Sequence, residues 1–298
     1  AGTSWATPIT ISDGAGDCID SDNTMEGAVP TIGPNGEVYV SWTGKDTLFF
    51  DKSTDGGISW LPNDMAITSI PGGWDYTIPG LNRCNGLPIT ICDTASTSIN
   101  NGNIYINWTD QRNGLSDTDV WLVKSTDGGN TWSAPSRVND DAPGKHQFLT
   151  WMAVDQANGN LYFVFFDRRN YSNSLTDVYM AQSTDGGNTF ENFRISESPF
   201  LPSSGVFFGD YTNLAAYNNV IRPIWTRMDF GVLSVYTALV DPLILGNENY
   251  DEPDEVYNYP NPFTQETYFS FKLRYKMNVT AALYDQLGRL VATIIDNQ

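Results

Sequence analysis

The chain has 298 residues, with 35 aspartates and glutamates against 16 lysines and arginines, and its formal net charge is −19. This charge disfavours a nucleic-acid partner and an anionic membrane surface, and no apolar run reaches the length of a transmembrane helix. The length is sufficient for a large all-β domain, and residues 1–245 show little helical periodicity.

Acidic residues crowd the first loop of the chain, between residues 13 and 26. Asp17, Asp20 and Asp22 provide hard oxygen ligands at a spacing that can hold calcium. Met25 stands where the EF-hand pattern requires glycine, so a solvated acidic turn is the favoured interpretation. Calcium is therefore the one cofactor that the sequence leaves open.

Four segments share a β-strand pattern that ends in an aromatic residue, and an Asn-Gly or Asn-Asn turn precedes each of them. Asn-Gly between apolar runs is the strongest short-range hairpin signal. A short apolar strand precedes each turn. The expected strand pairs are Ala28–Ile32 with Glu37–Trp42, Leu87–Cys92 with Asn103–Trp108, Trp151–Val154 with Asn160–Phe165, and Asn213–Ala216 with Asn219–Trp225.

An octapeptide of the form Ser-x-Asp-Gly-Gly-x-[Ser/Thr]-[Trp/Phe] follows a further β-rich run in three of these four units. The copies are Ser53–Trp60, Ser125–Trp132 and Ser183–Phe190. The paired glycines allow positive φ in a tight turn, and the aspartate can accept hydrogen bonds from backbone N–H groups of that turn. Each unit is thus expected to have four antiparallel strands. The predicted fold class is all-β, a β-propeller.

The octapeptide resembles the Asp-box, or bacterial neuraminidase repeat, of sialidase-like β-propellers. In that family the box joins the third and fourth strands of a blade, away from the active-site face. The resemblance implies that Asp55, Asp127 and Asp185 are structural residues and that any chemistry lies elsewhere.

The first five residues, Ala1 to Trp5, align with the second half of an octapeptide, so Thr7–Ser12 is expected to be an outer strand. This strand either belongs to a preceding blade of a larger propeller or completes the last blade and closes a four-bladed ring. We favour the larger propeller, because a native chain seldom starts within a turn motif. Residues 1–245 would then be four recognisable blades of a six- or seven-bladed parent.

Arginine and aspartate recur at fixed positions beyond the second strand of a unit. Arg112 and Arg169 occupy the same position, and Asp119 and Asp177 open the next strand in an identical Thr-Asp-Val sequence. Recurrence from unit to unit favours architecture over chemistry. We therefore predict Asp–Arg bridges that tie the second and third strands of adjacent blades.

The last unit departs from this pattern, and such departures are where function tends to lie. Arg227 stands where the second unit has Asp110, and Asp210 and Tyr211 enter the innermost strand, which lines the channel of a propeller. Sialidases use a Tyr nucleophile. The resemblance thus makes Tyr211, Asp210 and Arg227 the candidate catalytic residues. No glutamate adjoins Tyr211, so its base would come from another blade; a packing role for Tyr211 is equally open.

Three cysteines leave an odd count, which in an extracellular protein is consistent with one disulfide and one free thiol. Spacing permits Cys84–Cys92 or Cys18–Cys92. We favour Cys18–Cys92 as the pair more typical of sequences that resemble this one, with three reduced cysteines as the alternative. One histidine and no Cys-x-x-Cys make a zinc or redox site unexpected.

The composition changes after the fourth unit, and residues 246–256 are acidic and expected to form a linker. Beyond them stand Tyr-Pro-Asn-Pro-Phe263, a strand that ends in Leu283-Tyr-Asp, and Leu287-Gly-Arg-Leu-Val. This combination resembles the start of the type A C-terminal sorting domain of type IX secretion. The resemblance implies an incomplete β-sandwich over residues 257–298 and export through the outer membrane.

The sequence therefore predicts an exported cell-surface or secreted β-propeller that binds a glycan or a surface protein through its channel face. Its C-terminal domain would contact the type IX secretion machinery. An exo-α-sialidase or related glycoside hydrolase is the alternative function, and a structural surface or filament component is the second alternative. The sequence leaves open whether the protein is an enzyme.

Overall fold

A computed structural model describes residues 4–17, 19, 23–240, 256–259, 264–271, 281–284 and 289–295. They belong to two compact units, residues 1–242 and 243–298. All secondary-structure elements in these ranges are β-strands, so the described part of the chain is all-β. It contains no helix that is long and apolar enough to cross a membrane.

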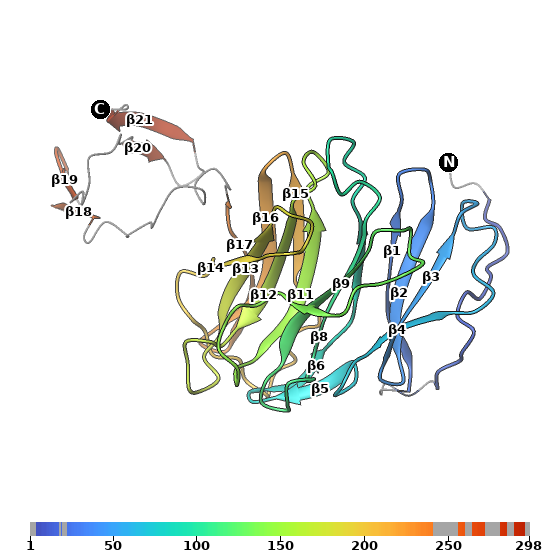
Figure 1. Ribbon diagram of the computed structural model, residues 1–298. Coiled ribbons are helices and arrows are strands. Elements are labelled where there is room, and N and C mark those ends of the chain that lie inside the picture. The colour runs from blue at the N-terminus through green and yellow to red at the C-terminus, as the bar shows by residue number, and fades with distance from the viewer. Residues whose placement is uncertain are drawn as a thin grey trace. The chain divides into compact units, whose positions relative to one another are not determined.

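The first unit contains four antiparallel sheets that follow one another along the chain, and a two-stranded hairpin in the connection between the first and the second (Figure 1). The first sheet contains β1 (Met25–Ile32), β2 (Val38–Gly44), β3 (Thr47–Ser53) and β4 (Met65–Ser69). The second contains β7 (Ile89–Cys92), β8 (Ile104–Asp110), β9 (Asp119–Ser125) and β10 (Ser136–Arg137). The third contains β11 (Gln147–Val154), β12 (Leu161–Asp167), β13 (Asp177–Ser183) and β14 (Glu191–Arg194), and the fourth β15 (Asn213–Tyr217), β16 (Val220–Asp229) and β17 (Val232–Thr237).

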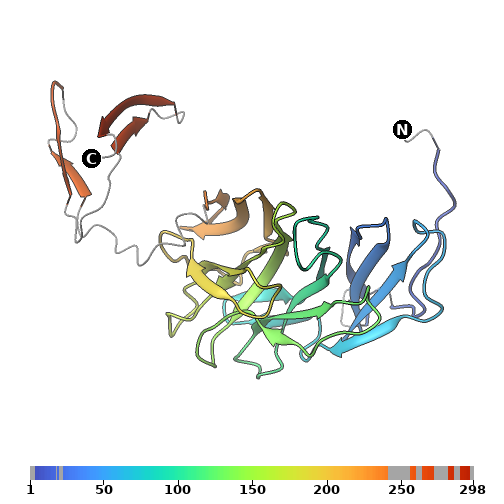
Figure 2. The same cartoon turned by 45° about the horizontal axis from the view of Figure 1, so that its top comes forward.

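The innermost strands β1, β7, β11 and β15 contact one another in that order. Figure 2 shows the sheets side by side, with the first sheet at one end of the row and the fourth at the other. Successive four-stranded antiparallel sheets that meet through their first strands are the blades of a β-propeller. The predicted fold class and the four predicted strand pairs are therefore confirmed. The fourth sheet has three strands, where four were predicted.

Aromatic and aliphatic side chains fill the space between consecutive sheets. Between the first and second sheets, Phe50 and Trp108 are fully buried in one cluster. Between the second and third, Tyr105 and Phe163 are fully buried in another. Each sheet thus buries apolar surface only by lying against its neighbour, which is how propeller blades are stabilised.

The segment Thr7–Ser12 forms no strand, so the prediction of an outer strand there is wrong. A strand needs a ladder of backbone hydrogen bonds to a neighbour. The segment is fastened instead by its end, where the backbone N–H of Asp13 donates to Asp64 and that of Asp64 donates to Asp13.

The three octapeptides adopt one turn. In the second copy, the hydroxyl of Ser125 donates to Asp127 at 2.8 Å and accepts from the backbone N–H of Gly129 at 2.8 Å. Asp127 also accepts bonds from the backbone N–H and the hydroxyl of Thr131. The same bonds recur around Asp55 and Asp185. These bonds hold the pKa of each of the three aspartates well below its usual range.

Lysines bind the second and third octapeptide turns to the preceding sheet. Lys52 of β3 donates to the carbonyl oxygen of Gly128 and the side chain of Asn130, both at 2.7 Å. Lys124 of β9 makes the same two bonds to the third octapeptide, at residues 186 and 188. A Cβ added to Gly129 would lie 2.6 Å from the ring of Phe50, so this turn approaches the preceding sheet closely. The octapeptides thus join neighbouring blades as well as closing hairpins.

The predicted disulfide between Cys18 and Cys92 is not formed. Cys92 is a free, buried thiol in β7, and Cys84 is also free and buried, while Cys18 lies outside the described residues. Cys92 belongs to the apolar cluster between the first two sheets, and burial raises the pKa of its thiol to about 12. Its side chain is therefore a core residue.

One carboxylate breaks the apolar pattern inside the first sheet. Asp51 of β3 is fully buried at the position that Val123 and Ala181 occupy in the second and third sheets. Its Oδ1 accepts two backbone N–H bonds, but its Oδ2 has no partner. Burial raises the pKa of Asp51, and the charges of Asp64 and Asp13 raise it further.

The second unit contains two antiparallel hairpins. They are β18 (Val256–Tyr259) with β19 (Tyr268–Phe271), and β20 (Ala281–Tyr284) with β21 (Leu290–Ile295). The predicted linker, apart from Val256, lies outside the described residues.

Replacing Ser125 with alanine should lower the free energy of unfolding by about 1–2 kcal/mol, because the turn loses a buried donor and acceptor. Asp127→Ala should also destabilise the protein. Because the folded-state pKa values of these aspartates are depressed, their contribution should be present above about pH 4 and be lost as the pH falls. Urea unfolding curves measure the effect, with Ser116→Ala in an exposed loop as control. A Ser125→Ala variant of unchanged stability would contradict the structural role.

Replacing Asp51 with asparagine should raise the free energy of unfolding at pH 7, because the amide keeps the acceptor and removes a buried charge. A raised folded-state pKa means that Asp51 favours folding most below about pH 4 and loses that contribution as the pH rises through the folded-state value. The gain from Asp51→Asn should therefore shrink on acidification. Unfolding curves at several pH values test this, with the exposed Asp46→Asn as control; a destabilised variant at pH 7 would contradict the prediction.

Candidate functional site

The sheets have two ends: the octapeptide turns lie at one end, and buried aspartate–arginine pairs lie at the other. In an antiparallel four-stranded sheet, the turns after the first and third strands share one end. The innermost strands begin at the other end, where the second and third strands are connected. We call this the entry end, and all the predicted functional residues of the last blade lie there.

Two carboxylates lie opposite each other at the entry end of the second sheet. Asp110 of β8 and Asp119 of β9 are register partners, and both are fully buried. Arg112 binds Asp110 at 2.5 Å and also donates to the carbonyl oxygen of Ser69, the last residue of β4. Arg137 of β10 lies 3.3 Å from Asp119. Each carboxylate therefore has its own arginine.

The third sheet repeats this arrangement. Asp167 and Asp177 are register partners, and both are fully buried. Arg169 binds Asp167 at 2.8 Å and also binds Asp140 of the preceding connection, while Arg194 lies 3.9 Å from Asp177. Burial raises the pKa of Asp167, and its bonds to Arg169 oppose the shift.

The carboxylate partner of Arg112 is therefore Asp110, and Asp119 is bound by a different arginine. The prediction of bridges between second and third strands is corrected on this point. The tight loop after the second strand folds each guanidinium back onto the aspartate two residues before it, so the bridge is local. Its link to the neighbouring blade comes from the further bond to Ser69.

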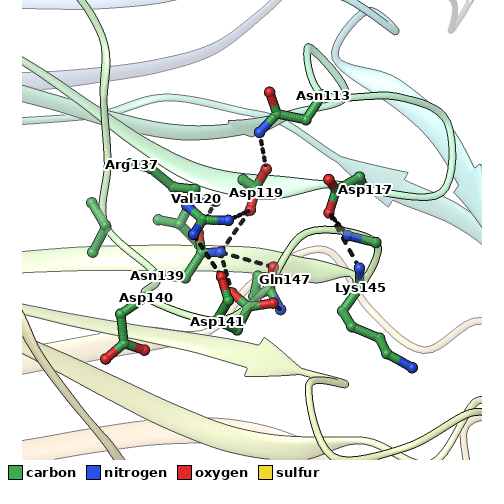
Figure 3. Close-up of polar contacts among 12 residues, drawn as sticks. Asn113, Asp117, Asp119, Val120, Arg137, Asn139, Asp140, Asp141, Lys145 and Gln147 are labelled. Atoms are coloured by element: carbon green, nitrogen blue, oxygen red, sulfur yellow. Dashed lines mark hydrogen bonds and ion pairs between the residues drawn. The ribbon is translucent and has the colours of Figure 1, made fainter.

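A polar network connects the second and third sheets (Figure 3). Asn139 donates to Asp119 and Asp141, both at 2.6 Å, and to Gln147, the first residue of β11, at 3.0 Å. Gln147 in turn donates to Asp141 at 3.0 Å and to Asp167 at 3.3 Å. The buried carboxylates of both sheets are thus bonded to fixed donors, an arrangement that joins the blades.

Arg227 forms the same kind of bridge in the fourth sheet with the order of residues reversed. It binds Asp229, two residues after it, through two nitrogens at 2.6 and 2.9 Å. It also donates to the backbone and side chain of Ser198 and lies over the rings of Phe200 and Tyr236. The fourth sheet therefore has an Asp–Arg pair like those of the other sheets, although its sequence departs from the repeat. The structure does not bring Arg227 together with Tyr211.

Asp210 is bound by a hairpin that the sequence analysis missed. Strands β5 (Asp75–Ile78) and β6 (Leu81–Asn85) form this hairpin in the chain segment that connects the first sheet to the second. Arg83 of β6 lies 3.3 Å from Asp210, and the amide of Asn85 donates to the Asp210 carbonyl oxygen at 2.7 Å. The signal for it was weak, because Gly72, Gly73 and Gly80 bracket the strands without an Asn-Gly turn.

Three further bonds hold the hairpin across the entry end. Tyr76 shares a 2.6 Å bond with Thr109 of the second sheet. Arg168, at the end of the third sheet's second strand, donates to the carbonyl oxygen of Pro79 at 2.6 Å. Asn82 donates to Ser204, in the segment that leads into the fourth sheet. The hairpin therefore spans from the second sheet to the fourth and fixes the position of Arg83.

Tyr211 lies at this junction with its side chain largely exposed, at 61%. Partial burial raises the pKa of its hydroxyl, the charges of Asp210 and of Glu26 in β1 raise it further, and Arg83 opposes them. We call Glu26, Arg83, Asp210 and Tyr211 the entry cluster. Glu26 of this cluster comes from the first blade, but a phenol with a raised pKa is neutral at pH 7 and a weak nucleophile.

The predicted calcium ligands are only partly described. Asp20 and Asp22 lie outside the described residues, and Asp17 accepts a bond from the backbone of Ile19. Among the residues that the structure describes, no group of three or more His, Cys, Asp or Glu side chains is arranged to hold a metal ion. Calcium at this loop stays a prediction.

Comparison with known proteins gives similarity only at the level of the backbone. No protein-family model and no curated protein matches the chain. Solved structures that resemble it include a Hadza microbial sialidase, with 16% identity over 72% of this chain and 44% of that chain and a TM-score of 0.46. An α-L-arabinofuranosidase from Fusarium graminearum has 14% identity over 72% and 61%, with a TM-score of 0.46.

A third similar structure is the Penicillium chrysogenum α-L-arabinanase complexed with arabinobiose, with 16% identity over 72% of this chain and 62% of that one and a TM-score of 0.47. The chain spans less than two thirds of the length of each of these enzymes. Similarity at this level does not transfer an activity to this chain, since one fold hosts many functions.

Proposed function

We propose that this protein is an exported, cell-surface or secreted β-propeller that binds a glycan at the entry cluster. The observation that supports this most directly is the convergence of Glu26, Arg83, Asp210 and Tyr211 from the first blade, the β5–β6 hairpin and the approach to the fourth blade. Such convergence of separate chain segments around an exposed aromatic ring is not needed to pack the blades.

The chemistry of the cluster suits a sugar. The Tyr211 side chain offers an apolar ring face and a polar hydroxyl, which matches the mixed apolar and polar surface of a pyranose or furanose ring. Carboxylates accept hydrogen bonds from sugar hydroxyls, and the guanidinium of Arg83 donates to them. A few convergent polar groups beside an apolar surface are typical of small-molecule sites.

A sialidase-like glycoside hydrolase is the second candidate. The octapeptides resemble the Asp-box in sequence, and the charge of Glu26 acts on the hydroxyl of Tyr211, where a Tyr nucleophile needs a carboxylate. Against it, burial and the charges of Asp210 and Glu26 raise the pKa of the Tyr211 phenol, and Arg227 is bound to Asp229. Binding without turnover is therefore the function that we favour.

Replacing Tyr211 with alanine should weaken glycan binding by about 10- to 100-fold, the range for loss of a central aromatic contact. Calorimetry against a panel of oligosaccharides measures the affinity. Arg227→Gln is the matched control: it should lower the free energy of unfolding by about 1 kcal/mol and leave binding unchanged. Hydrolysis of a fluorogenic sialoside, abolished by Tyr211→Phe, would instead favour the sialidase.

Export rests on the C-terminal motifs and their resemblance to the type IX sorting domain. A passenger protein that carries the natural C-terminal module, beginning at residue 257, should be released by a bacterium with a type IX system. A module in which Tyr259 to Phe263 are scrambled is the control and should leave the passenger inside. Retention of the passenger with the intact module would contradict the proposed localisation.

A further inference from the structure

We propose that the entry cluster selects a neutral glycan and rejects an acidic one. This inference rests on the proposed glycan binding and concerns the charge of the ligand. The charges of Asp210 and Glu26 both act on the hydroxyl of Tyr211, and the guanidinium of Arg83 is already paired with Asp210 at 3.3 Å. A ligand carboxylate placed beside Tyr211 would therefore meet more negative than positive charge.

Recognition of a sugar acid needs an arginine whose donor fork is open, because the planar fork matches a carboxylate through two parallel hydrogen bonds. At the entry end the forks of Arg112, Arg169 and Arg227 close on protein carboxylates. Each of these carboxylates would have to be displaced before a ligand could bind there. None of these three arginines can therefore bind a ligand carboxylate through two parallel hydrogen bonds unless its ion pair with an aspartate is broken.

Arg168 is the remaining arginine near the hairpin, and it too is unsuited to a ligand in solvent. It donates to Pro79 and to Thr176, and its Nη2 has no partner. However, only 3% of its surface is exposed, so a ligand could reach this nitrogen only if the β5–β6 hairpin moved away. Breaking the Pro79 bond and opening the hairpin would also displace Arg83 from Asp210.

The charge of the whole chain acts in the same direction. A net charge of −19 produces a negative potential that disfavours the approach of an anion, and the effect weakens as salt is added. A neutral sugar has no such penalty. Its hydroxyls can donate to the carboxylates of Asp210 and Glu26 and accept from the guanidinium of Arg83, so it can form hydrogen bonds with both the acidic and the basic groups of the site.

Matched glycan pairs test this selectivity. Galactobiose and digalacturonic acid differ in their carboxylates, and lactose and 3′-sialyllactose differ by one sialic acid residue. Arabinobiose and xylobiose extend the neutral set. Calorimetry on the whole chain should give binding of at least one neutral glycan, about tenfold or more tighter than its acidic counterpart. Binding of the neutral glycan should be lost in Tyr211→Ala.

Asp210→Asn tests the entry cluster directly, because it removes the negative charge that lies 3.3 Å from Arg83. It should narrow or reverse the preference within each pair, and Arg83→Gln should not. Glu191→Gln in the exposed part of β14 makes the same change in net charge and should leave the preference as it is. Circular dichroism confirms that each variant is folded.

The outcomes separate the two proposals. Acidic glycans that bind as tightly as their neutral partners would overturn the selectivity and leave glycan binding standing. An absence of binding to every glycan in the panel would overturn the proposed function itself. An equal change of preference in Asp210→Asn and Glu191→Gln would show that net charge, and not the entry cluster, sets the specificity.

Discussion

The burial of aromatic side chains between consecutive sheets is the interaction on which the rest of this structure depends. A single antiparallel sheet of four short strands has two faces and little core of its own. Phe50 and Trp108 are buried only because the second sheet lies on the first, and Tyr105 and Phe163 only because the third lies on the second. Every polar group that holds neighbouring sheets in register therefore contributes to the stability of the core.

The two ends of the sheets meet this requirement with different chemistry. At one end, serine hydroxyls and aspartate carboxylates accept hydrogen bonds from the backbone N–H groups of the octapeptide turns. A lysine of the preceding sheet also donates to each of the last two turns. At the entry end, buried aspartates are bound by arginines, and Asn139 and Gln147 link the second sheet to the third. A buried charge without a partner is costly, so these arginines are committed to architecture.

Because these arginines are bound to aspartates, they are poor candidates for ligand contacts at the entry end. Arg227 departs from the repeat in sequence, yet its contacts reproduce the bridge of the other blades. Tyr211 and the charged groups beside it do not belong to the apolar clusters between the first three sheets. They converge only because the β5–β6 hairpin crosses the entry end and carries Arg83 to Asp210. The site is thus defined by an insertion in the repeat and not by the repeat.

The sequence by itself determined the all-β class, the four strand pairs and the turns at the octapeptides, because hairpin turns and alternating strands are local and their signals lie within a few residues. It did not determine the partners of Arg112, the free state of Cys92, the unpaired segment Thr7–Ser12 or the approach of Glu26 to Tyr211. Only the tertiary structure decided these, since each depends on which blades and connections lie side by side, and spacing along the chain carries no information on contacts between distant segments.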